Sequence, residues 1–367
     1  MIAKRLALVT DAWHPQTNGV VNTLARLTKY LESQGTEVLL VTPDGYRTIP
    51  LPGDPDYRIA INPWRSIPRI RAFKPDAVHI ATEGPLGFWV NGYMRRRGFR
   101  FTSSFHTRFP EYMAARFPIP VSFGYKLERW FHRAAEHTFV GTKSLMRELD
   151  GHRVGQHLVH WPRGVDTQRF NPSKRRQEVY EGLAGPIWLY VGRVSPEKSI
   201  EDFLNLKLPG TKVVVGDGPS REMLVKKYPQ VVFRGWRFDE DLAAHFASAD
   251  CFVFPSRTET FGNVILESLA SGVPVASVPA PGPIDLIQNG VNGAVSENLL
   301  DACMIALRCT REKARQSTEP YTFIASHNQF RRNLVPMVKL LPAATPSLAE
   351  ARSAMAVEHA SSDVPAE

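Results

Sequence analysis

Short apolar runs alternate with longer amphipathic stretches along most of this chain. The runs predict buried strands at residues 5–10, 37–42, 76–80, 101–105, 138–141, 187–191, 211–215, 231–233 and 251–255. Helical periodicity follows several of them and predicts helices at residues 21–34 and 298–312, and others starting near Pro85, Val121 and Ile200. Residues 43–68, rich in Pro, Gly and Asp, predict a long loop with one short strand. Strand and helix in alternation indicate parallel α/β sheets.

One stretch, residues 255–275, combines a helix with candidate chemistry and reads PSRTETFGNVILESLASGVPV. Its apolar positions fit one buried helix face, and Gly272 and Pro274 end the helix. A glycine turn at a helix N-terminus presents free N–H groups and the positive end of the helix dipole, which suits a phosphate. Glu259 and Glu267 could hold hydroxyl groups on either side of a diphosphate, as in a nucleotide sugar. The simpler alternative is that Glu267 is a surface residue of an amphipathic helix.

A second candidate anion site follows the predicted strand at residues 187–191. Arg193 and Lys198 lie on the loop between this strand and the helix from Ile200, so both cations can converge on one anion. Two fixed cations can stabilise a departing diphosphate without a metal. This loop contains no Asp-x-Asp motif, so it implies no divalent cation, and we expect no other cofactor. Gly19 precedes the helix at 21–34 without a G-x-G-x-x-G fingerprint, which makes a dehydrogenase a weak interpretation.

Composition fits a soluble, two-domain protein. The 367 residues are 43% hydrophobic and 22% charged, and no apolar run reaches the roughly 18 residues of a membrane span. The N-terminus MIAKRLALVT lacks a signal-peptide cleavage pattern. Cys251, Cys303 and Cys309 have neither metal-ligand spacing nor a disulfide pattern. We therefore expect a cytoplasmic protein.

The basic charge is concentrated in the first half. Residues 1–165 carry 23 Lys and Arg against 13 Asp and Glu, whereas the remainder carries 22 against 23. Such an excess attracts anionic lipid surfaces or nucleic acid. It includes a cluster at Arg95, Arg96, Arg97 and Arg100, and residues 115–138 mix Tyr125, Trp130 and Phe131 with Lys126, Arg129 and Arg133. Aromatic and basic residues together suit a membrane interface; the alternative is a core helix with a solvated charged face.

The Glu-x7-Glu string followed by Leu-Ala-Ser-Gly-Val-Pro-Val resembles the donor-site signature of retaining glycosyltransferase family 4, and the resemblance extends to about residue 340. It implies the α/β fold called GT-B, in which two Rossmann-like parallel α/β domains face each other across a cleft. The implied boundaries are an acceptor-binding domain at 1–165, a nucleotide-sugar-binding domain at 166–320 and a helix at 321–342 that crosses back. The polar tail at 343–367 predicts disorder.

The resemblance also implies roles for individual residues. Four residues are implied in catalysis. His106, in the string FHTRFPEY, would lie close to the donor sugar, and Glu259 would bind the sugar hydroxyls. Arg193 and Lys198 would neutralise the diphosphate. Donor-binding positions are Gly19, Val20, Gly216, Gly218, Arg237, Phe261, Gly262, Asn263, Val264 and, on the ribose, Glu267. Glu83, Arg108 and Tyr112 would face the acceptor. The loop with Pro281, Gly282 and Asp285 departs from the family pattern and is left outside the predicted site.

The resulting hypothesis is a retaining glycosyltransferase that moves a hexose from a nucleotide diphosphate sugar, with a UDP-sugar favoured, to a membrane lipid. Diacylglycerol is the expected acceptor type, and the expected location is peripheral on the inner face of the cell membrane. One rival is a soluble transferase, for example GDP-mannose-dependent, acting on a polysaccharide or small acceptor. Another is a non-catalytic nucleotide-sugar-binding protein. Nucleic-acid binding rests on net charge alone and is not expected as a partner function.

Overall fold

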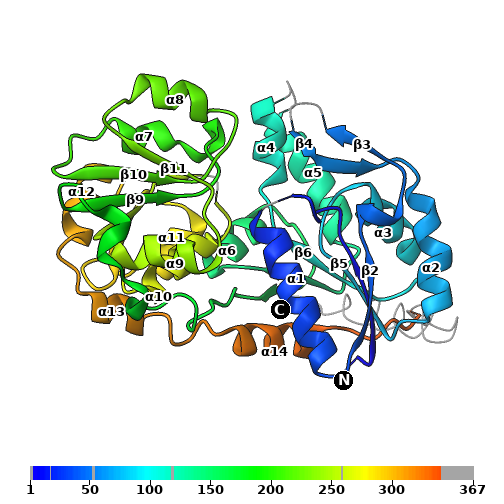
Figure 1. Ribbon diagram of the computed structural model, residues 1–367. Helices are drawn as coiled ribbons and strands as arrows, with labels where there is room; N and C mark the ends of the chain where they lie inside the picture. Colours follow the sequence, from blue (N-terminus) through cyan, green and yellow to red (C-terminus); the bar gives the residue numbers. More distant parts are fainter. Residues whose placement is uncertain (1–2, 17, 52–53, 117–119, 258, 340–367) are drawn as a thin grey trace, which may run out of the picture.

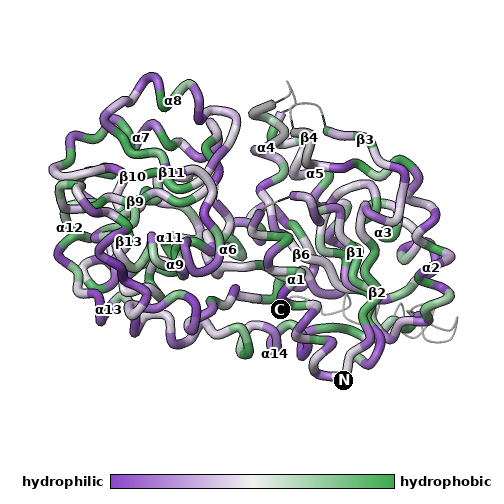
Figure 2. Tube along the Cα trace, viewed as in Figure 1, coloured by the Kyte–Doolittle hydropathy of each residue, from purple (hydrophilic) through white to green (hydrophobic). Residues whose placement is uncertain are grey.

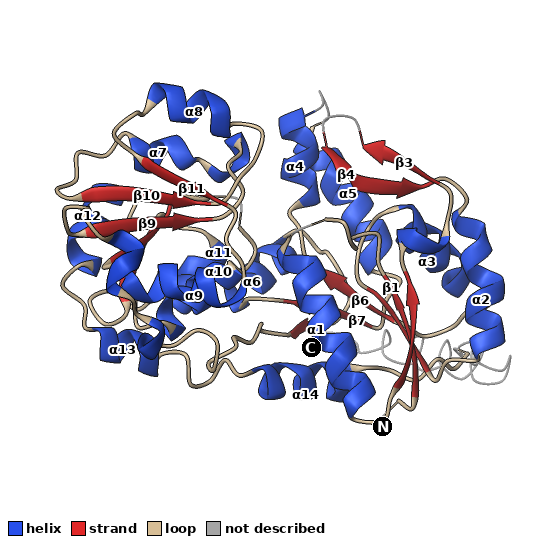
Figure 3. Cartoon of the chain, viewed as in Figure 1, coloured by secondary structure: helices blue, strands red, loops and turns tan. Residues whose placement is uncertain are grey.

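The chain folds into two lobes that lie side by side (Figure 1). The structure is a computed structural model, and it describes residues 3–16, 18–51, 54–116, 120–257 and 259–339. Each lobe contains one six-stranded parallel sheet, with strand order β2-β1-β5-β6-β7-β8 in the first and β11-β10-β9-β12-β13-β14 in the second. Helices lie on the faces of the sheets (Figure 3). This arrangement confirms the predicted α/β class with two Rossmann-like units.

The strands of the first lobe are β1 (Arg5–Val9), β2 (Glu37–Val41), β5 (Ala77–Ile80), β6 (Thr102–Phe105), β7 (His137–Val140) and β8 (Leu158–His160). Its helices are α1 (Gly19–Ser33), α2 (Ser66–Phe73), α3 (Pro85–Arg97), α4 (Phe109–Arg116), α5 (Val121–His132) and α6 (Lys143–Gly151). Strands β1 and β2 are mostly hydrophobic in Figure 2, as expected for strands covered on both faces.

The strands of the second lobe are β9 (Ile187–Val191), β10 (Thr211–Val215), β11 (Val232–Gly235), β12 (Cys251–Phe254), β13 (Val275–Ser277) and β14 (Gly293–Val295). Its helices are α7 (Ile200–Leu204), α8 (Arg221–Lys227), α9 (Asp239–Ser248), α10 (Asn263–Ala270), α11 (Pro281–Leu286), α12 (Leu299–Ala306) and α13 (Arg311–Gln316). All five residues of β9 and all four of β12 are buried at the centre of this sheet. Two hydrophobic clusters, one on each face, enclose them.

Three element predictions were wrong. Residues 43–68 contain an antiparallel hairpin of β3 (Thr48–Leu51) and β4 (Asp54–Ala60) instead of a loop with one strand. The single helix expected at 298–312 is divided into α12 and α13, because the Thr310 hydroxyl accepts the Lys313 N–H and starts a new helix. The last helix, α14 (Phe323–Asn333), is shorter than expected. It ends at the extended residue Leu334, two positions before Pro336.

Helix α14 returns the chain to the first lobe (Figure 1). The crossing points are paired, since the Val165 N–H donates to the Tyr321 carbonyl at 2.9 Å. From α14, Asn328 accepts a hydrogen bond from the Tyr30 hydroxyl of α1, and the Ser326 carbonyl accepts from Trp161. The segment after α14 is extended, and its Met337 N–H donates to the Asp76 carbonyl. The predicted tail at 343–367 lies outside the described residues.

Helix α5 contains the aromatic and basic residues noted in the sequence, and it buries some of the aromatic side chains. Within α5, Tyr125 and Phe131 are buried and belong to the lobe core, whereas Trp130 is 45% exposed. The core alternative therefore holds for two of the three aromatic residues named from the sequence. In the described part of the chain, no helix is both long enough and apolar enough to pass through a bilayer.

Candidate active site

The turn from β12 into α10 has the geometry predicted for an anion site. Gly262 caps α10 with φ +81° and ψ 70°, in the left-handed region that favours glycine. No described side chain caps the helix, so its first N–H groups stay available to a ligand. The helix dipole adds partial positive charge at the same place. A phosphate bound at this turn would accept hydrogen bonds from these N–H groups and interact with the positive end of the helix dipole.

Lys198 and Glu259, two of the predicted catalytic residues, are in direct contact. The Lys198 Nζ lies 2.8 Å from Glu259 Oε2, and both side chains are partly exposed. Burial by itself lowers the pKa of Lys198, but the carboxylate of Glu259 outweighs it and raises the pKa above its ordinary value. The charge of Arg193 is near enough to oppose that rise. Lys198 therefore remains protonated at neutral pH, beside a second cation and a carboxylate.

Glu267 lies one turn into α10 and is partly buried. Burial raises the pKa of Glu267 to about 7, while the positive charges of Arg26 and Arg169 act in the opposite direction. Arg26 belongs to α1 of the first lobe, so Glu267 faces the boundary between the lobes. A carboxyl group in this setting is poised to accept hydrogen bonds, and a pair of ribose hydroxyls would favour its charged form.

Gly216 and Gly218 bring the ends of β9 and β10 close together. A Cβ at Gly216 would lie 1.9 Å from the Gly192 carbonyl oxygen, and one at Gly218 would lie 2.5 Å from the Val194 carbonyl oxygen. The Val194 N–H also donates to the Asp217 carbonyl at 2.9 Å. The glycine turn therefore holds the loop that carries Arg193 and Lys198. Its predicted contact with the donor stays a prediction.

Two helix N-termini, one from each lobe, meet at the boundary. The Asn263 side chain donates from Nδ2 to the Gly19 carbonyl at 3.4 Å. A Cβ at Gly19 would lie 3.1 Å from that nitrogen, so glycine permits the approach. The side chain of Asn18 caps α1 by accepting the N–H of Val20 and of Val21, each at 3.0 Å. In this state the Val20 amide is already hydrogen-bonded within its own lobe.

His106 follows β6 and is only 6% exposed. Its Nδ1 lies 2.6 Å from Arg163 Nη2. Because a guanidinium can only donate, Nδ1 must accept and carries no proton. Burial, reinforced by the charge of Arg163, lowers the pKa of His106 well below its ordinary value. The neutral ring therefore carries its proton on Nε2, which has no hydrogen-bond partner in the part of the chain that the structure describes.

The second lobe also reaches His106. The Thr260 hydroxyl donates to the His106 carbonyl at 2.8 Å, and Thr260 directly follows Glu259. This contact brings the free Nε2–H of His106 and the carboxylate of Glu259 to the same part of the boundary. A hydrogen-bond donor and an acceptor in these positions can both bond to hydroxyls of one sugar ring.

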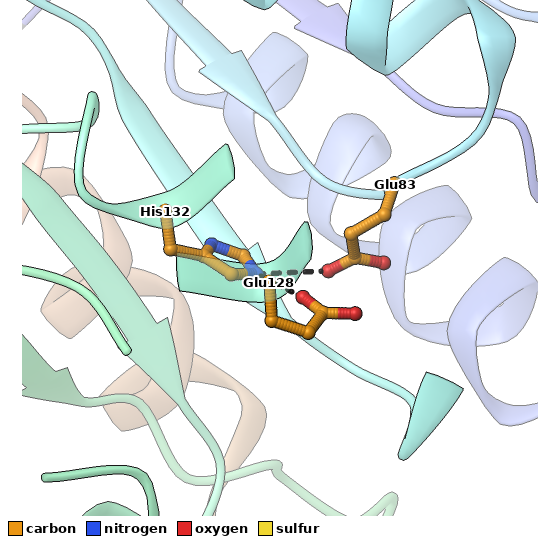
Figure 4. A group of neighbouring side chains, drawn as sticks. All are labelled: Glu83, Glu128 and His132. Atoms are coloured by element: carbon orange, nitrogen blue, oxygen red, sulfur yellow. Dashed lines mark hydrogen bonds and ion pairs between the residues drawn. The ribbon is translucent and has the colours of Figure 1, made fainter. Parts of the chain in front are cut away.

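Glu83 lies three residues beyond β5 in a buried triad with Glu128 and His132 (Figure 4). His132 Nε2 is 3.1 Å from Glu83 Oε1 and 3.1 Å from Glu128 Oε2, and its Nδ1 is 2.9 Å from the Ser103 hydroxyl. Burial, with repulsion from Glu128, raises the pKa of Glu83 to about 7. Burial lowers the pKa of His132, yet the two carboxylates more than compensate and raise it to about 9. His132 thus holds Glu83 in place from the protein interior.

Arg108, predicted to face the acceptor, is held by two carboxylates. Its Nη2 lies 2.5 Å from Glu148 and 3.0 Å from Glu111, and the Tyr125 hydroxyl donates to Glu111 at 2.8 Å. These residues line a pocket of about 450 Å³ between α4, α5 and α6. Tyr112 lies on α4, but its side chain is outside the described part. The acceptor role of both residues stays a prediction.

Three other predicted donor residues lie at the edge of this arrangement. Arg237 pairs with Asp241, Nε to Oδ2 at 3.3 Å, on the outside of α9. Phe261 is 4% exposed, and a Cβ at Gly141 would lie 3.4 Å from its ring, so Phe261 offers a ligand mainly its backbone. Val264 packs partly buried against the hydrophobic core of its lobe. The contacts described above join Lys198 to Glu259, and the hydrogen bond from Thr260 brings His106 to the same part of the boundary.

Sequence reasoning missed two side chains. Arg163, which is not among the predicted site residues, orients His106 as described above. Its place after β8 was a usable signal, because carboxyl ends of parallel strands share one edge. Asp285, left outside the site, accepts the Ser144 N–H at 2.9 Å and the Ser144 hydroxyl across the lobe boundary. Nothing in the sequence places Ser144 opposite Asp285.

Two family models match the two lobes in turn. The one described as Glycosyltransferase Family 4 matches residues 17–169, and the one described as Glycosyl transferases group 1 matches residues 185–309. A GDP-mannose-dependent alpha-mannosyltransferase of Mycobacterium tuberculosis is 33% identical over 314 residues, covering 78% of this chain and 82% of that protein. Sulfoquinovosyl transferase SQD2 of Arabidopsis thaliana is 32% identical, covering 89% of this chain and 72% of that protein.

A more distant relative and a solved structure complete the comparison. Alpha-monoglucosyldiacylglycerol synthase of Streptococcus pneumoniae is 25% identical, covering 90% of this chain and 84% of that protein. Sucrose-phosphate synthase of Thermosynechococcus elongatus shares the fold with a TM-score of 0.73 at 21% identity, covering 90% of this chain and 98% of that one. From the matched lobes, the sequence relatives and the site geometry, we conclude that the chain belongs to glycosyltransferase family 4 and is a glycosyltransferase with the GT-B fold.

Proposed function

We propose that this protein is a retaining hexosyltransferase that moves a hexose from a nucleotide diphosphate sugar to a hydroxyl of a membrane lipid such as diacylglycerol. The observation that carries the proposal is the contact of Lys198 with Glu259 beside the uncapped N-terminus of α10. A cation and helix N–H groups suit a diphosphate, and a carboxylate suits sugar hydroxyls. The three features together match the two ends of a nucleotide sugar.

In the proposed reaction the diphosphate lies at Gly262, close to Arg193 and Lys198. His106 Nε2–H and Glu259 hold the hexose, and Glu267 takes the ribose. The bond between the anomeric carbon and the diphosphate oxygen breaks while these cations take up the leaving charge. The acceptor oxygen attacks from the same face, and its proton passes to the departing phosphate oxygen. The anomeric configuration is retained, and we propose that the fixed cations replace a divalent ion.

The acceptor proposal rests on charge and on relatives. The excess of 10 positive charges in residues 1–165 suits an anionic membrane surface. One relative is named as a diacylglycerol-glucosylating enzyme. We therefore place the protein peripherally on the inner face of the cell membrane. A UDP-hexose is the first donor to test, and GDP-mannose is the second candidate because a 33% identical relative is GDP-mannose-dependent.

A donor panel with diacylglycerol in detergent tests the proposal. UDP-glucose, UDP-galactose, UDP-glucuronate and GDP-mannose are each incubated with the protein in the presence of EDTA, and products are identified by mass spectrometry and NMR. One donor should give a glycosyl-diacylglycerol with the donor's anomeric configuration. An inverted product would contradict retention, and loss of activity in EDTA would contradict metal independence. Transfer to soluble acceptors alone would favour the soluble alternative, and any turnover would exclude a non-catalytic protein.

A further inference from the structure

Three exposed tryptophans form an aromatic surface on the first lobe. Trp64 in a short 3₁₀ helix (Pro63–Arg65), Trp89 in α3 and Trp130 in α5 are 53%, 39% and 45% exposed. Soluble surfaces carry single exposed apolar side chains, but a cluster of large ones marks an interaction site. We call Trp64, Trp89 and Trp130 the tryptophan face.

Aromatic contacts hold this face in a defined shape. The rings of Trp64 and Trp89 meet edge to face with centroids 6.2 Å apart, and Trp130 stacks on Phe88 at 5.7 Å. The Arg95 guanidinium lies over the Trp130 ring at 4.5 Å. Between them runs a surface groove of about 710 Å³, lined by Pro63, Pro85, Phe88, Trp89, Gly92, Arg95, Arg96 and Trp130. The indoles are therefore presented to solvent by a fixed scaffold.

The charge around this face is almost entirely positive. Residues 57–100 and helix α5 together contain eleven Lys and Arg but only three acids, Asp76, Glu83 and Glu128, and Glu128 is buried beside His132. Glu83 is buried against His132, and the Asp76 carboxylate accepts the backbone N–H groups of Lys4 and Arg5. Arg65, Arg95, Arg96 and Arg97 are exposed. No described carboxylate on these elements is left to neutralise them.

We propose that the tryptophan face docks on the surface of an anionic lipid bilayer. Indole rings favour the boundary between lipid headgroups and acyl chains, and arginines favour the lipid phosphates just outside it. The face combines both within one groove. Trp and Arg are also enriched in protein interfaces, so the choice of a bilayer rests on the exposed positive charge of Arg65, Arg95, Arg96 and Arg97 around the groove. The inference deepens the proposed function, because a lipid acceptor must be drawn from a bilayer.

The position of the face agrees with that role. Pro85 lines the groove, begins α3 and lies two positions after Glu83, a predicted acceptor residue. Helix α5 supplies both Trp130 on the outside and His132, which holds Glu83, on the inside. A bilayer docked on the face would therefore meet the lobe beside the predicted acceptor side of the site.

Vesicle flotation of the full chain tests the docking surface without requiring catalysis. Vesicles contain either phosphatidylcholine alone or phosphatidylcholine mixed with phosphatidylglycerol, at low and high salt. The wild type should bind the anionic vesicles at low salt. Two variants should bind these vesicles at least roughly tenfold more weakly than the wild type. One is the triple variant Trp64→Ser, Trp89→Ser, Trp130→Ser, and the other is the pair Arg95→Gln, Arg96→Gln. The pair Arg175→Gln, Arg176→Gln, exposed in the second lobe, is the matched charge control and should bind like wild type.

Circular dichroism and transfer to detergent-dispersed diacylglycerol are measured on the same samples. Native spectra with reduced flotation would support the surface. Three results would overturn the docking surface. Both face variants could float like the wild type, the control pair could lose flotation equally, or the wild type could bind nucleic acid but no vesicle. Transfer in detergent needs no vesicle. A wild type that shows no transfer in detergent would therefore count against the proposed function and not against the docking surface.

Discussion

At the scale of single residues, the site depends on charges kept in unusual states. The carboxylate of Glu259 raises the pKa of Lys198 above its ordinary value, His106 stays neutral because it is buried beside Arg163, and burial raises the pKa of Glu267 to about 7. Each state is set by neighbours from other elements. Such perturbed groups cluster at functional sites because catalysis needs fixed charges and donors.

Replacing Lys198 by alanine should reduce kcat by roughly 100-fold or more, because one fixed charge on the departing diphosphate is lost. Steady-state rates with saturating donor measure it. Lys207→Ala, an exposed lysine of the same lobe, is the control and should leave kcat unchanged. Near-normal turnover in Lys198→Ala would contradict the assigned role.

Glu267→Gln should raise the free energy of unfolding at pH 8 and lower the affinity for the donor. The folded-state pKa of Glu267 is raised from 4.5 to about 7, so the native protein holds this proton more tightly than the unfolded chain. Stability contributed by the protonated form is therefore lost as pH rises from 4.5 through 7. The variant, which stays neutral, should gain on the order of 1–3 kcal/mol of unfolding free energy at pH 8 and little at pH 5.

Urea denaturation at both pH values measures the effect of Glu267→Gln, and calorimetry measures nucleotide-sugar affinity, which should fall about tenfold with the loss of a charged hydrogen bond. Glu297→Gln, at a carboxylate whose side chain is 77% exposed, is the matched control. A Glu267→Gln protein that is less stable than wild type at pH 8 would show that the carboxylate is satisfied within the protein.

At the scale of elements, glycine turns and helix ends position these residues. Gly216 and Gly218 hold the loop of Arg193 and Lys198, and Gly262 leaves the N-terminus of α10 open. The glycine turn and helix of α10 could be read directly from the sequence, because apolar spacing and the Gly272–Pro274 stop are local signals. The hairpin of β3 and β4 could not, since its pairing depends on contacts between strands.

Gly262→Ala should weaken both folding and donor binding. An alanine at φ +81° costs roughly 1–2 kcal/mol, and its Cβ would lie 2.9 Å from the Ile265 side chain at the start of α10. Gly290→Ala is the matched control, because Gly290 has φ +75° but no atom within 4 Å of the added Cβ. Thermal unfolding should show a loss in both variants, whereas donor affinity should fall in Gly262→Ala alone. Equal donor affinity in the two variants would remove the helix N-terminus from the site.

At the scale of the whole molecule, hydrogen bonds across the lobe boundary assemble the site. Thr260 reaches His106, Asn263 reaches Gly19, and Asp285 reaches Ser144. Each pair joins residues more than 100 positions apart in sequence. The site therefore exists as a unit only when the lobes are in contact.

Asp285→Ala should favour separation of the lobes by roughly tenfold or more in equilibrium constant, because charge-assisted hydrogen bonds from Ser144 are lost. Small-angle scattering should show a larger radius of gyration without donor, and the KM for donor should rise. Asp301→Ala, an exposed acid on α12, is the control. An unchanged radius together with an unchanged KM would show that Asp285 does not hold the lobes.

The sequence by itself determined the α/β class, most strands and the charged residues at strand and helix ends, because these depend on local hydrophobic spacing and turn chemistry. Only the tertiary structure decided that Arg163 orients His106, that His132 holds Glu83 and that Asp285 joins the lobes. It also decided which aromatic rings of α5 are buried and that Trp130 joins Trp64 and Trp89 at the surface. These features depend on which distant segments pack together, and a side chain's charge state and exposure follow from that packing.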